Sequence, residues 1–366
     1  MKKNVKRYAA FFMGITLAVT LLNGCSPAND KSQDNNSNTA GEKVTSALPD
    51  VSQYSKTKVF TIGDSEVMLD EVMWYVYLME DEFREDAKQY KKDHNSSYYD
   101  VIIDKDNNTT VADKVRQEII DQISYYEIMS AQAVDSGKYT FEDEKTLEEK
   151  AKKKFESVDK DVAEKCGLTQ KSYENILKKW TYTDLLYSDI TKLYDIDDEV
   201  KKVIKEKYKD EELRQYDTEY LFVSYYDGSN KLSDDEIEKR KKELEKIAGN
   251  VKEDNDMSLL ASGNVTYGNT NFVNNDSDST STEYKNAAMK LENKAVSDIV
   301  ETNEGCYIIR MKDNNSKEYY NYIYDSADKS YRSQKFQEEY QNIEGNYPIK
   351  IDEDIWNAID IGNMTS

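Results

Sequence analysis

The stretch that decides the fold reads Glu283-Tyr284-Lys285-Asn286-Ala287-Ala288-Met289-Lys290-Leu291, then Ala295-Val296-Ser297-Asp298-Ile299-Val300-Glu301-Thr302, then Gly305-Cys306-Tyr307-Ile308-Ile309-Arg310-Met311. Apolar residues in its first part recur at helical spacing and predict a short amphipathic helix. Ile299-Val300 and the run after Gly305 are strand-like, and the turn Asn303-Glu304-Gly305 separates them. The stretch therefore predicts a helix followed by a β-hairpin.

The residues before this stretch extend the same small mixed domain. Glu219-Tyr220-Leu221-Phe222-Val223-Ser224-Tyr225 is typical of a strand. Ser233-Asp234-Asp235-Glu236 forms a capping box that opens a helix ending near Gly249. An irregular Gly- and Asn-rich run follows over residues 262–281. We expect one domain over residues 214–315, with a small antiparallel sheet flanked by helices.

On both sides of this domain the sequence favours helices. Between Pro49 and Pro348 there is no proline, which favours long helices and argues against a turn-rich barrel. Ordered structure is expected to begin near Val59, with Asp70 as the N-cap of the first helix and a polar loop after Phe83. Further helices are predicted over residues 141–158, 169–194, 197–209 and about 326–340. The predicted fold class is therefore α+β.

Composition excludes several classes of function. The chain of 366 residues contains one histidine, His94, so histidine-based metal clusters are excluded and a Ser-His-Asp site would need that residue. Its net charge of -22 would repel a phosphate backbone, so no nucleic acid partner is expected. Two calcium-like loops lack the required glycine, and we expect no metal and no cofactor. Cys166 and Cys306 are expected to be free, buried thiols, although a disulfide is also open.

The N-terminus has the pattern of a lipoprotein leader. Four basic residues precede an apolar run from Tyr8 to Leu22, which is too short for a stable span. Leu22-Asn23-Gly24-Cys25 resembles a bacterial lipobox, so residues 1–24 are predicted to be a signal peptide and Cys25 the lipidated residue. Residues 25–56 are polar and predict a disordered tether. The expected location is the cell membrane, with the body lipid-anchored on the extracytoplasmic side.

The ordered series of segments resembles the extracytoplasmic foldases of the PrsA and SurA type. The entry Ile62-Gly63-Asp64-Ser65-Glu66-Val67-Met68-Leu69-Asp70-Glu71 is similar to the opening of that family, and Ile196-Asp197-Asp198-Glu199-Val200 to its last helix before the isomerase. The best match is the stretch from Tyr284 to Met311, which follows the parvulin helix and terminal hairpin. The resemblance implies a helical chaperone domain split into residues 57–213 and 316–366, with a parvulin-like peptidyl-prolyl isomerase domain inserted between them.

The resemblance also implies where a peptide would bind. The two parvulin histidines fall on Tyr220 and Tyr307, and the glycine-rich turn falls on Tyr267-Gly268-Asn269-Thr270-Asn271-Phe272. Phe272 and Tyr284 keep the aromatic character of the proline pocket. We therefore take Tyr220, Phe272, Tyr284 and Tyr307 as candidates for a peptide groove, and we assign no catalytic residue. Tyr220 and Tyr307 are also explained as ordinary half-buried sheet residues.

Three functions follow from this interpretation. The first is a membrane-anchored folding helper that binds unfolded or secreted polypeptides and has weak isomerase activity or none. The second is an active prolyl isomerase, because rotation about an X–Pro bond needs no nucleophile and tyrosine hydroxyls both donate and accept hydrogen bonds. The third is a surface binding or adhesion lipoprotein that reuses the scaffold. Clients, oligomeric state and the distance between the two thiols are not predicted.

Overall fold

A computed structural model describes residues 47–139, 142–275 and 278–365. The predicted signal peptide, Cys25 and most of the tether lie outside the described residues. The end of the predicted tether is ordered, because Val51–Lys56 forms a 3-10 helix that buries Tyr54 in the core, so the expectation of disorder up to residue 56 was wrong there. Within the part that is described, no helix is both long enough and apolar enough to cross a membrane.

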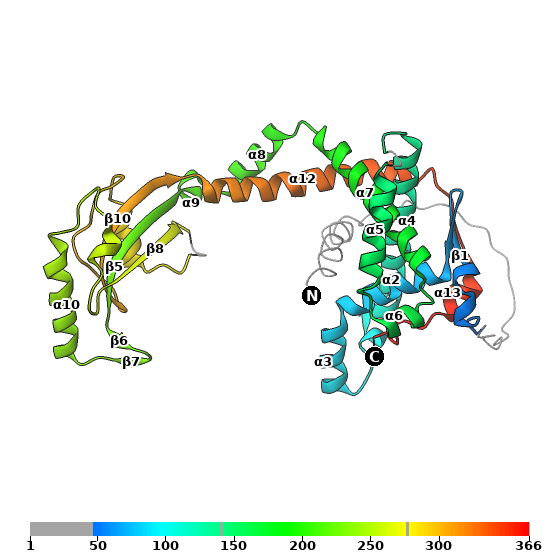
Figure 1. The fold of residues 1–366 in the computed structure, drawn as a ribbon, viewed down its shortest axis with the longest axis horizontal. Helices are drawn as coiled ribbons and strands as arrows, with labels where there is room; N and C mark the ends of the chain where they lie inside the picture. Colours follow the sequence, from blue (N-terminus) through cyan, green and yellow to red (C-terminus); the bar gives the residue numbers. More distant parts are fainter. Residues whose placement is uncertain (1–46, 140–141, 276–277, 366) are drawn as a thin grey trace. The chain divides into compact units, whose positions relative to one another are not determined.

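The chain folds into two compact units (Figure 1). Residues up to Tyr194 and from Arg332 onward form one of them, here called the helical unit. Asp195–Tyr331 forms the other, here called the inserted unit. A split helical domain with an α+β insertion is the predicted fold class, which is confirmed. This division places α8 (Asp197–Lys207), α9 (Asp210–Leu213) and the start of α12 (Glu318–Glu344) in the inserted unit, and the limits at 213 and 315 stay a prediction.

Packed helices dominate the helical unit, and α4 and α7 lie side by side (Figure 1). Thr169 caps α7: its hydroxyl accepts from the amide of Ser172 at 3.1 Å. Ile176, Leu177 and Trp180 then recur on one buried face of that helix. The elements of this unit before α12 are η1 (Val51–Lys56), β1 (Lys58–Ile62), β2 (Ser65–Met68), α2 (Leu69–Glu82), α3 (Arg84–His94), η2 (Tyr98–Asp100), β3 (Ile102–Asp104), β4 (Thr109–Thr110), α4 (Val111–Asp135), α5 (Glu142–Phe155), α6 (Lys160–Lys165) and α7 (Gln170–Lys192).

The C-terminal residues complete the core of the helical unit. Strand β11 (Ile349–Ile351) pairs antiparallel with β1, which also pairs with β2. Trp356 on α13 (Glu353–Ala358) packs edge-on against Phe60, with ring centroids 5.2 Å apart. Arg116 on α4 donates to the carbonyl oxygens of Trp356 and Ile359. Both ends of the described chain therefore meet in one core.

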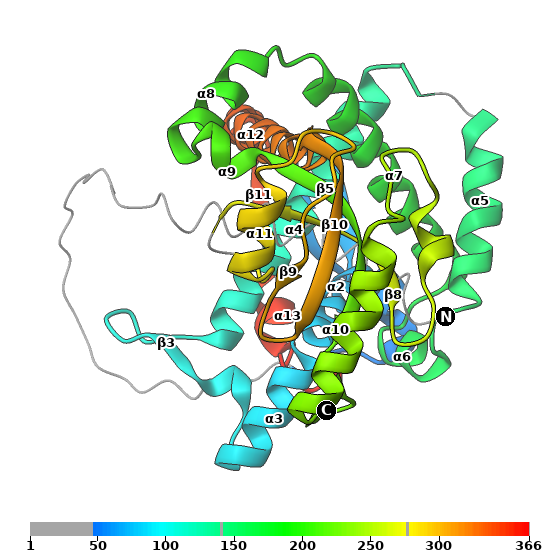
Figure 2. The same cartoon turned by 90° about the vertical axis from the view of Figure 1, so that its left-hand side faces the viewer.

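A four-stranded sheet with the order β8-β5-β10-β9 forms the centre of the inserted unit (Figure 2). Neighbouring strands pair antiparallel. Helix α10 covers one face over Leu221 and Ile308, and α11 covers the other over Ile309. The remaining elements before α12 are β5 (Gln215–Ser224), β6 (Tyr226–Asp227), β7 (Asn230–Lys231), α10 (Asp234–Ala248), η3 (Met257–Leu260), β8 (Thr266–Val273), α11 (Thr282–Ala288), β9 (Val300–Glu301) and β10 (Gly305–Ser316).

Some sequence expectations were wrong in detail. The first helix begins at Leu69, so Asp70 lies inside its first turn and is not the N-cap. The expected loop after Phe83 contains α3, which buries none of its residues and so has no apolar face to reveal it. The last long helix, α12, begins at Glu318 instead of about Ser326, because its tyrosine-rich start lacks a clear helical pattern. Cys166 and Cys306 are free and buried, as expected.

Candidate functional site: an aromatic face and an acidic hollow

The predicted groove residues lie on the sheet face that α11 covers. Side chains alternate between the two faces of a strand, and paired residues share a face. Tyr220 on β5 pairs with Gly268 and Ile309, while Tyr307 on β10 pairs with Phe222. Ile309 contributes to the core formed with α11, so all these side chains share its face.

The structure brings the four candidates together. The ring of Tyr284 lies 6.1 Å from that of Tyr220, 5.1 Å from Tyr307 and 6.2 Å from Phe272, measured between centroids. Tyr220 and Tyr307 are 5.4 Å apart. These pairs are edge-to-face, the arrangement that the charge distribution of aromatic rings favours. Phe222, which stacks on Tyr307 at 4.4 Å, was not predicted, although its spacing of two from Tyr220 is the signal for a shared face. The five residues are called the aromatic face below.

Exposure differs within the aromatic face. Phe272 and Tyr284 are 1% and 3% exposed, so they form its floor. Tyr220, Phe222 and Tyr307 are half-buried. The aromatic face therefore presents part of three rings to solvent above a packed base.

Gly268 is what allows the ring of Tyr220 to lie against β8. A Cβ atom at this position would lie 2.5 Å from the hydroxyl oxygen of Tyr220. No real Cβ contact is this short, so any larger residue would displace the ring. Close packing against Tyr220 thus explains why glycine occupies position 268, which its expected place in a glycine-rich turn did not indicate.

The hydroxyl groups fall into two kinds. Thr218 donates its only hydroxyl proton to the carbonyl of Thr270 at 3.1 Å, so at its 2.8 Å contact with Tyr284 it must accept. The proton of Tyr284 is therefore used inside the fold. Among the described residues, the hydroxyl groups of Tyr220 and Tyr307 have no hydrogen-bond partner, which leaves both free to bond a ligand.

Burial affects the ionisation of two tyrosines of the aromatic face. Burial raises the pKa of Tyr307 to about 12, with Glu304 and Tyr220 adding to the rise. Burial likewise raises the pKa of Tyr284. The single histidine, His94, lies on α3 of the helical unit. The aromatic face can therefore grip a chain by stacking and neutral hydrogen bonds, but it offers no general acid or base at pH 7.

The helical unit contains a second candidate site, which the sequence analysis missed. A hollow of about 850 Å³ is bordered by β2, α2, α4 and α7. Asp70, Glu71 and Glu127 line it and are 2%, 7% and 4% exposed. Lys179 bonds Glu71 at 2.8 Å and also contacts Glu127. The hollow around these four residues is called the acidic hollow below. The sequence did contain a signal for this site, because charged residues that interrupt an apolar helical stripe are rarely buried without a reason.

Burial shifts the ionisation of this group. It raises the pKa of Glu71 to about 7; Lys179 lowers that value, and Glu127 and Asp70 raise it. The pKa of Asp70 is also raised by burial, with Ser172 and the backbone amide of Glu71 acting against the rise. Burial lowers the pKa of Lys179, but Glu71 and Glu127 outweigh it and the net shift is upward. Lys179 therefore stays charged while Glu71 titrates near neutral pH.

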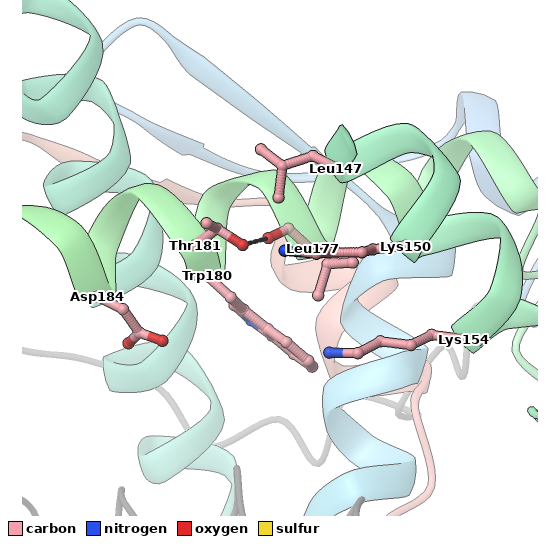
Figure 3. Close-up of a pocket in the computed structure, with 7 residues that line it drawn as sticks. All are labelled: Leu147, Lys150, Lys154, Leu177, Trp180, Thr181 and Asp184. Carbon is pink, nitrogen blue, oxygen red and sulfur yellow. Dashed lines mark hydrogen bonds between the residues drawn. The ribbon is translucent and has the colours of Figure 1, made fainter. Parts of the chain in front are cut away.

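A smaller hollow of about 230 Å³ lies between α5 and α7 (Figure 3). Trp180 forms one wall, and Lys154 reaches toward it from α5. Burial raises the pKa of Asp184 to about 6, and Lys154 lowers it.

Within the described part of the chain, no group of three or more His, Cys, Asp or Glu residues is arranged to hold a metal ion.

Comparison with known proteins gives matches to solved structures. No family model matches the chain, and no curated protein does. A chain from the work on the SurA-like chaperones PEB4 and Cj1289 of Campylobacter jejuni is 10% identical, with a TM-score of 0.30; the match covers 81% of this chain and 98% of that one. The foldase protein PrsA from Streptococcus pneumoniae is 16% identical, with a TM-score of 0.28 and coverages of 70% and 93%.

PrsA from Bacillus subtilis is 17% identical over 72% of this chain and 99% of that one, with a TM-score of 0.24. These three structures are PrsA proteins and a SurA-like chaperone, the type of protein that the sequence resembles. At these TM-scores and identities, the likeness carries no conclusion about activity.

Proposed function

We propose that this chain is a folding helper that binds unfolded polypeptides outside the cytoplasm. The aromatic face of the inserted unit would hold short apolar or proline-containing segments. The single observation that supports this proposal most is the convergence of Tyr220, Tyr284 and Tyr307, with two of their hydroxyl groups unused by the fold. Stacking on several rings is tolerant of sequence, which suits a protein with many clients.

Prolyl isomerisation is the second candidate function, and one observation favours it. Rotation about an X–Pro bond is accelerated when a site hydrogen-bonds the twisted imide more strongly than the planar one. The free hydroxyl groups of Tyr220 and Tyr307 are available for that role. We infer that any such activity is weak, because the site has no imidazole and no buried charge. A protease-coupled assay on Xaa–Pro peptides measures it directly.

The test of the main proposal is a client assay with the full chain in mild detergent. A stoichiometric excess of the full chain over an unfolding model client should suppress aggregation of the client. Tyr220→Ala combined with Tyr307→Ala should weaken the binding of a labelled unfolded peptide about tenfold, because two stacking rings are lost. Tyr226→Ala is the matched control, since Tyr226 is an exposed tyrosine on β6 of the same unit. Full aggregation in the presence of the wild-type chain would refute the proposal.

Membrane attachment through Cys25 is a further part of the proposal, supported by the lipobox at residues 22–25. Mass spectrometry of the purified protein should find a diacylglyceryl group on Cys25. Cys25→Ser should release the protein from the membrane fraction. An unmodified cysteine in a membrane-bound wild-type protein would contradict this part alone.

A further inference from the structure

The acidic hollow has more negative than positive charge. Asp70, Glu71 and Glu127 face a single paired cation, Lys179. The other two lysines of the lining are already engaged: Lys171 and Lys178 bond Glu174 at 3.0 and 3.2 Å, and Lys178 also lies 3.9 Å from Glu148. Burying a charge without a partner is costly, so this excess favours a cation.

A second observation points the same way. Asp70 lines the hollow, is 2% exposed, and leaves its Oδ2 atom without a hydrogen-bond partner. Its other oxygen accepts from the backbone amide of Glu71 at 2.9 Å, and the hydroxyl group of Ser172 lies close enough to lower the pKa of the carboxyl group. Buried carboxylate oxygens are nearly always bonded, so an unpartnered one beside a hollow indicates a missing donor.

The remaining lining selects the kind of cation. Within the described residues no metal-holding cluster is found, and Lys179 already occupies the space between Glu71 and Glu127. Met68, Val134 and Tyr182 add apolar wall. At about 850 Å³ the hollow is of the size that holds an organic group. A donor on an aliphatic stem fits this lining better than a bare ion.

We propose that the acidic hollow binds the ammonium or guanidinium group of a lysine or arginine side chain in a bound polypeptide. This inference rests on the proposed function and names a chemical preference at a second site of the same protein. The stem of the bound side chain would lie along the apolar wall. The N–H groups of the bound side chain would supply the hydrogen-bond donor that Oδ2 of Asp70 lacks.

Ligand binding should be linked to a proton. The charged groups around Glu71 are Asp70 on α2, Glu127 on α4, Lys179 on α7, and more distantly Lys171, Lys178 and Glu174 on α7, Asp135 on α4 and Glu66 on β2. Glu71 has a pKa raised to about 7 by burial, and a bound cation favours its ionised form. Binding should therefore release a proton near pH 7 and weaken from pH 8 to pH 6.

The experiment compares two labelled peptides that differ at one position, lysine or norleucine, with both ends blocked. Fluorescence anisotropy with the full chain measures each Kd at pH 7.5. The wild type should bind the lysine peptide about tenfold more tightly, the value of one charge-assisted contact. Asp70→Asn should reduce this ratio to about twofold or less. Asp81→Asn is the matched control: Asp81 is on the same helix, pairs with Arg84 outside the hollow, and should leave the ratio unchanged.

Each outcome decides a different point. Equal affinity of both peptides for the wild type, or an unchanged ratio in Asp70→Asn, overturns this inference and leaves the proposed function standing. Failure of the wild type to bind either peptide overturns both. If Asp70→Asn does not fold, Glu71→Gln serves the same purpose, and it should also abolish the change in affinity between pH 8 and pH 6.

Discussion

The two candidate sites differ in the physics that each unit offers. The aromatic face consists of aromatic rings, and burial raises the pKa of Tyr307 among them to about 12, while the acidic hollow consists of buried charges, one of which titrates near 7. The first should be nearly insensitive to pH and salt, and the second sensitive to both. On the two proposals made above, one chain would combine a sequence-tolerant surface with a charge-selective one.

The units also differ in how they are built. The inserted unit is contiguous in sequence and splits its core between the two faces of one sheet. The helical unit has one large core to which residues from both ends of the chain contribute. Perturbing one unit should therefore leave the site in the other largely intact, and the following predictions test this separation.

The largest effect is expected from Trp356→Ala. This side chain is buried against Phe60 and below Arg116, so its loss should cost the helical unit about 3–5 kcal/mol of unfolding free energy. Trp74 and Trp180 also lie in the helical unit, so tryptophan fluorescence in a urea titration reports on this unit alone. Amide exchange in the inserted unit should not change. Equal acceleration there would show that the two units unfold together.

Gly268→Ala should damage the aromatic face more than the fold. The added methyl group displaces the ring of Tyr220, at a cost of about 1–3 kcal/mol in the inserted unit. Binding of an unfolded peptide should weaken several-fold. Gly249→Ala is the control, because a Cβ there meets nothing within 4 Å and the backbone is helical. If Gly268→Ala leaves peptide binding unchanged, Tyr220 does not contribute to the binding site.

The two units should respond to acid with opposite signs. Glu71 binds its proton more tightly in the folded state, so the helical unit should lose stability as pH rises from about 4.5 to about 7. Glu71→Gln should flatten this slope. In the inserted unit Lys241 holds the pKa of Glu301 below its usual value, so that stability is lost only below about pH 4.5. Urea titrations and amide exchange between pH 3 and pH 8 separate the two slopes.

The smallest effect is expected from Tyr307→Phe. The ring stays, so unfolded-peptide binding should change less than twofold. Any acceleration of Xaa–Pro isomerisation should fall if the hydroxyl group bonds the twisted imide. An isomerisation rate equal to the uncatalysed one in the wild type would eliminate the isomerase candidate and leave the aromatic face as a binding surface only.

Four of the five residues of the aromatic face were predicted from the resemblance to parvulins, which assigned Tyr220 and Tyr307 to the two histidine positions and Phe272 and Tyr284 to the proline pocket. Side chains two residues apart on a strand share a face, and the pairing of β5 with β10 places Tyr220 and Tyr307 on the same face. Apolar residues at helical spacing likewise predicted the helix over residues 169–194, which is observed as α7. Phe222 was available from the same reasoning and was overlooked.

What could not be predicted depends on long-range packing. Helix α3 has no apolar stripe, so only its local contacts hold it. Glu71, Glu127 and Lys179 come from three helices, and no sequence spacing indicates that their side chains meet. The unpartnered oxygen of Asp70 depends on that same arrangement. The charged residues indicate a site only when the relative positions of the helices are known.

The pairing of β1 with β11 has a consequence for how the protein is made. A chain that leaves the ribosome or a translocation channel from its N-terminus emits β1 nearly three hundred residues before its partner strand. The inserted unit is complete by Tyr331, so it can fold while the first half of the helical unit still waits for residues 349–361. Contacts so distant in sequence form slowly. The core of the helical unit therefore stays incomplete until Phe336, Trp356, Ile359 and Ile361 have been synthesised.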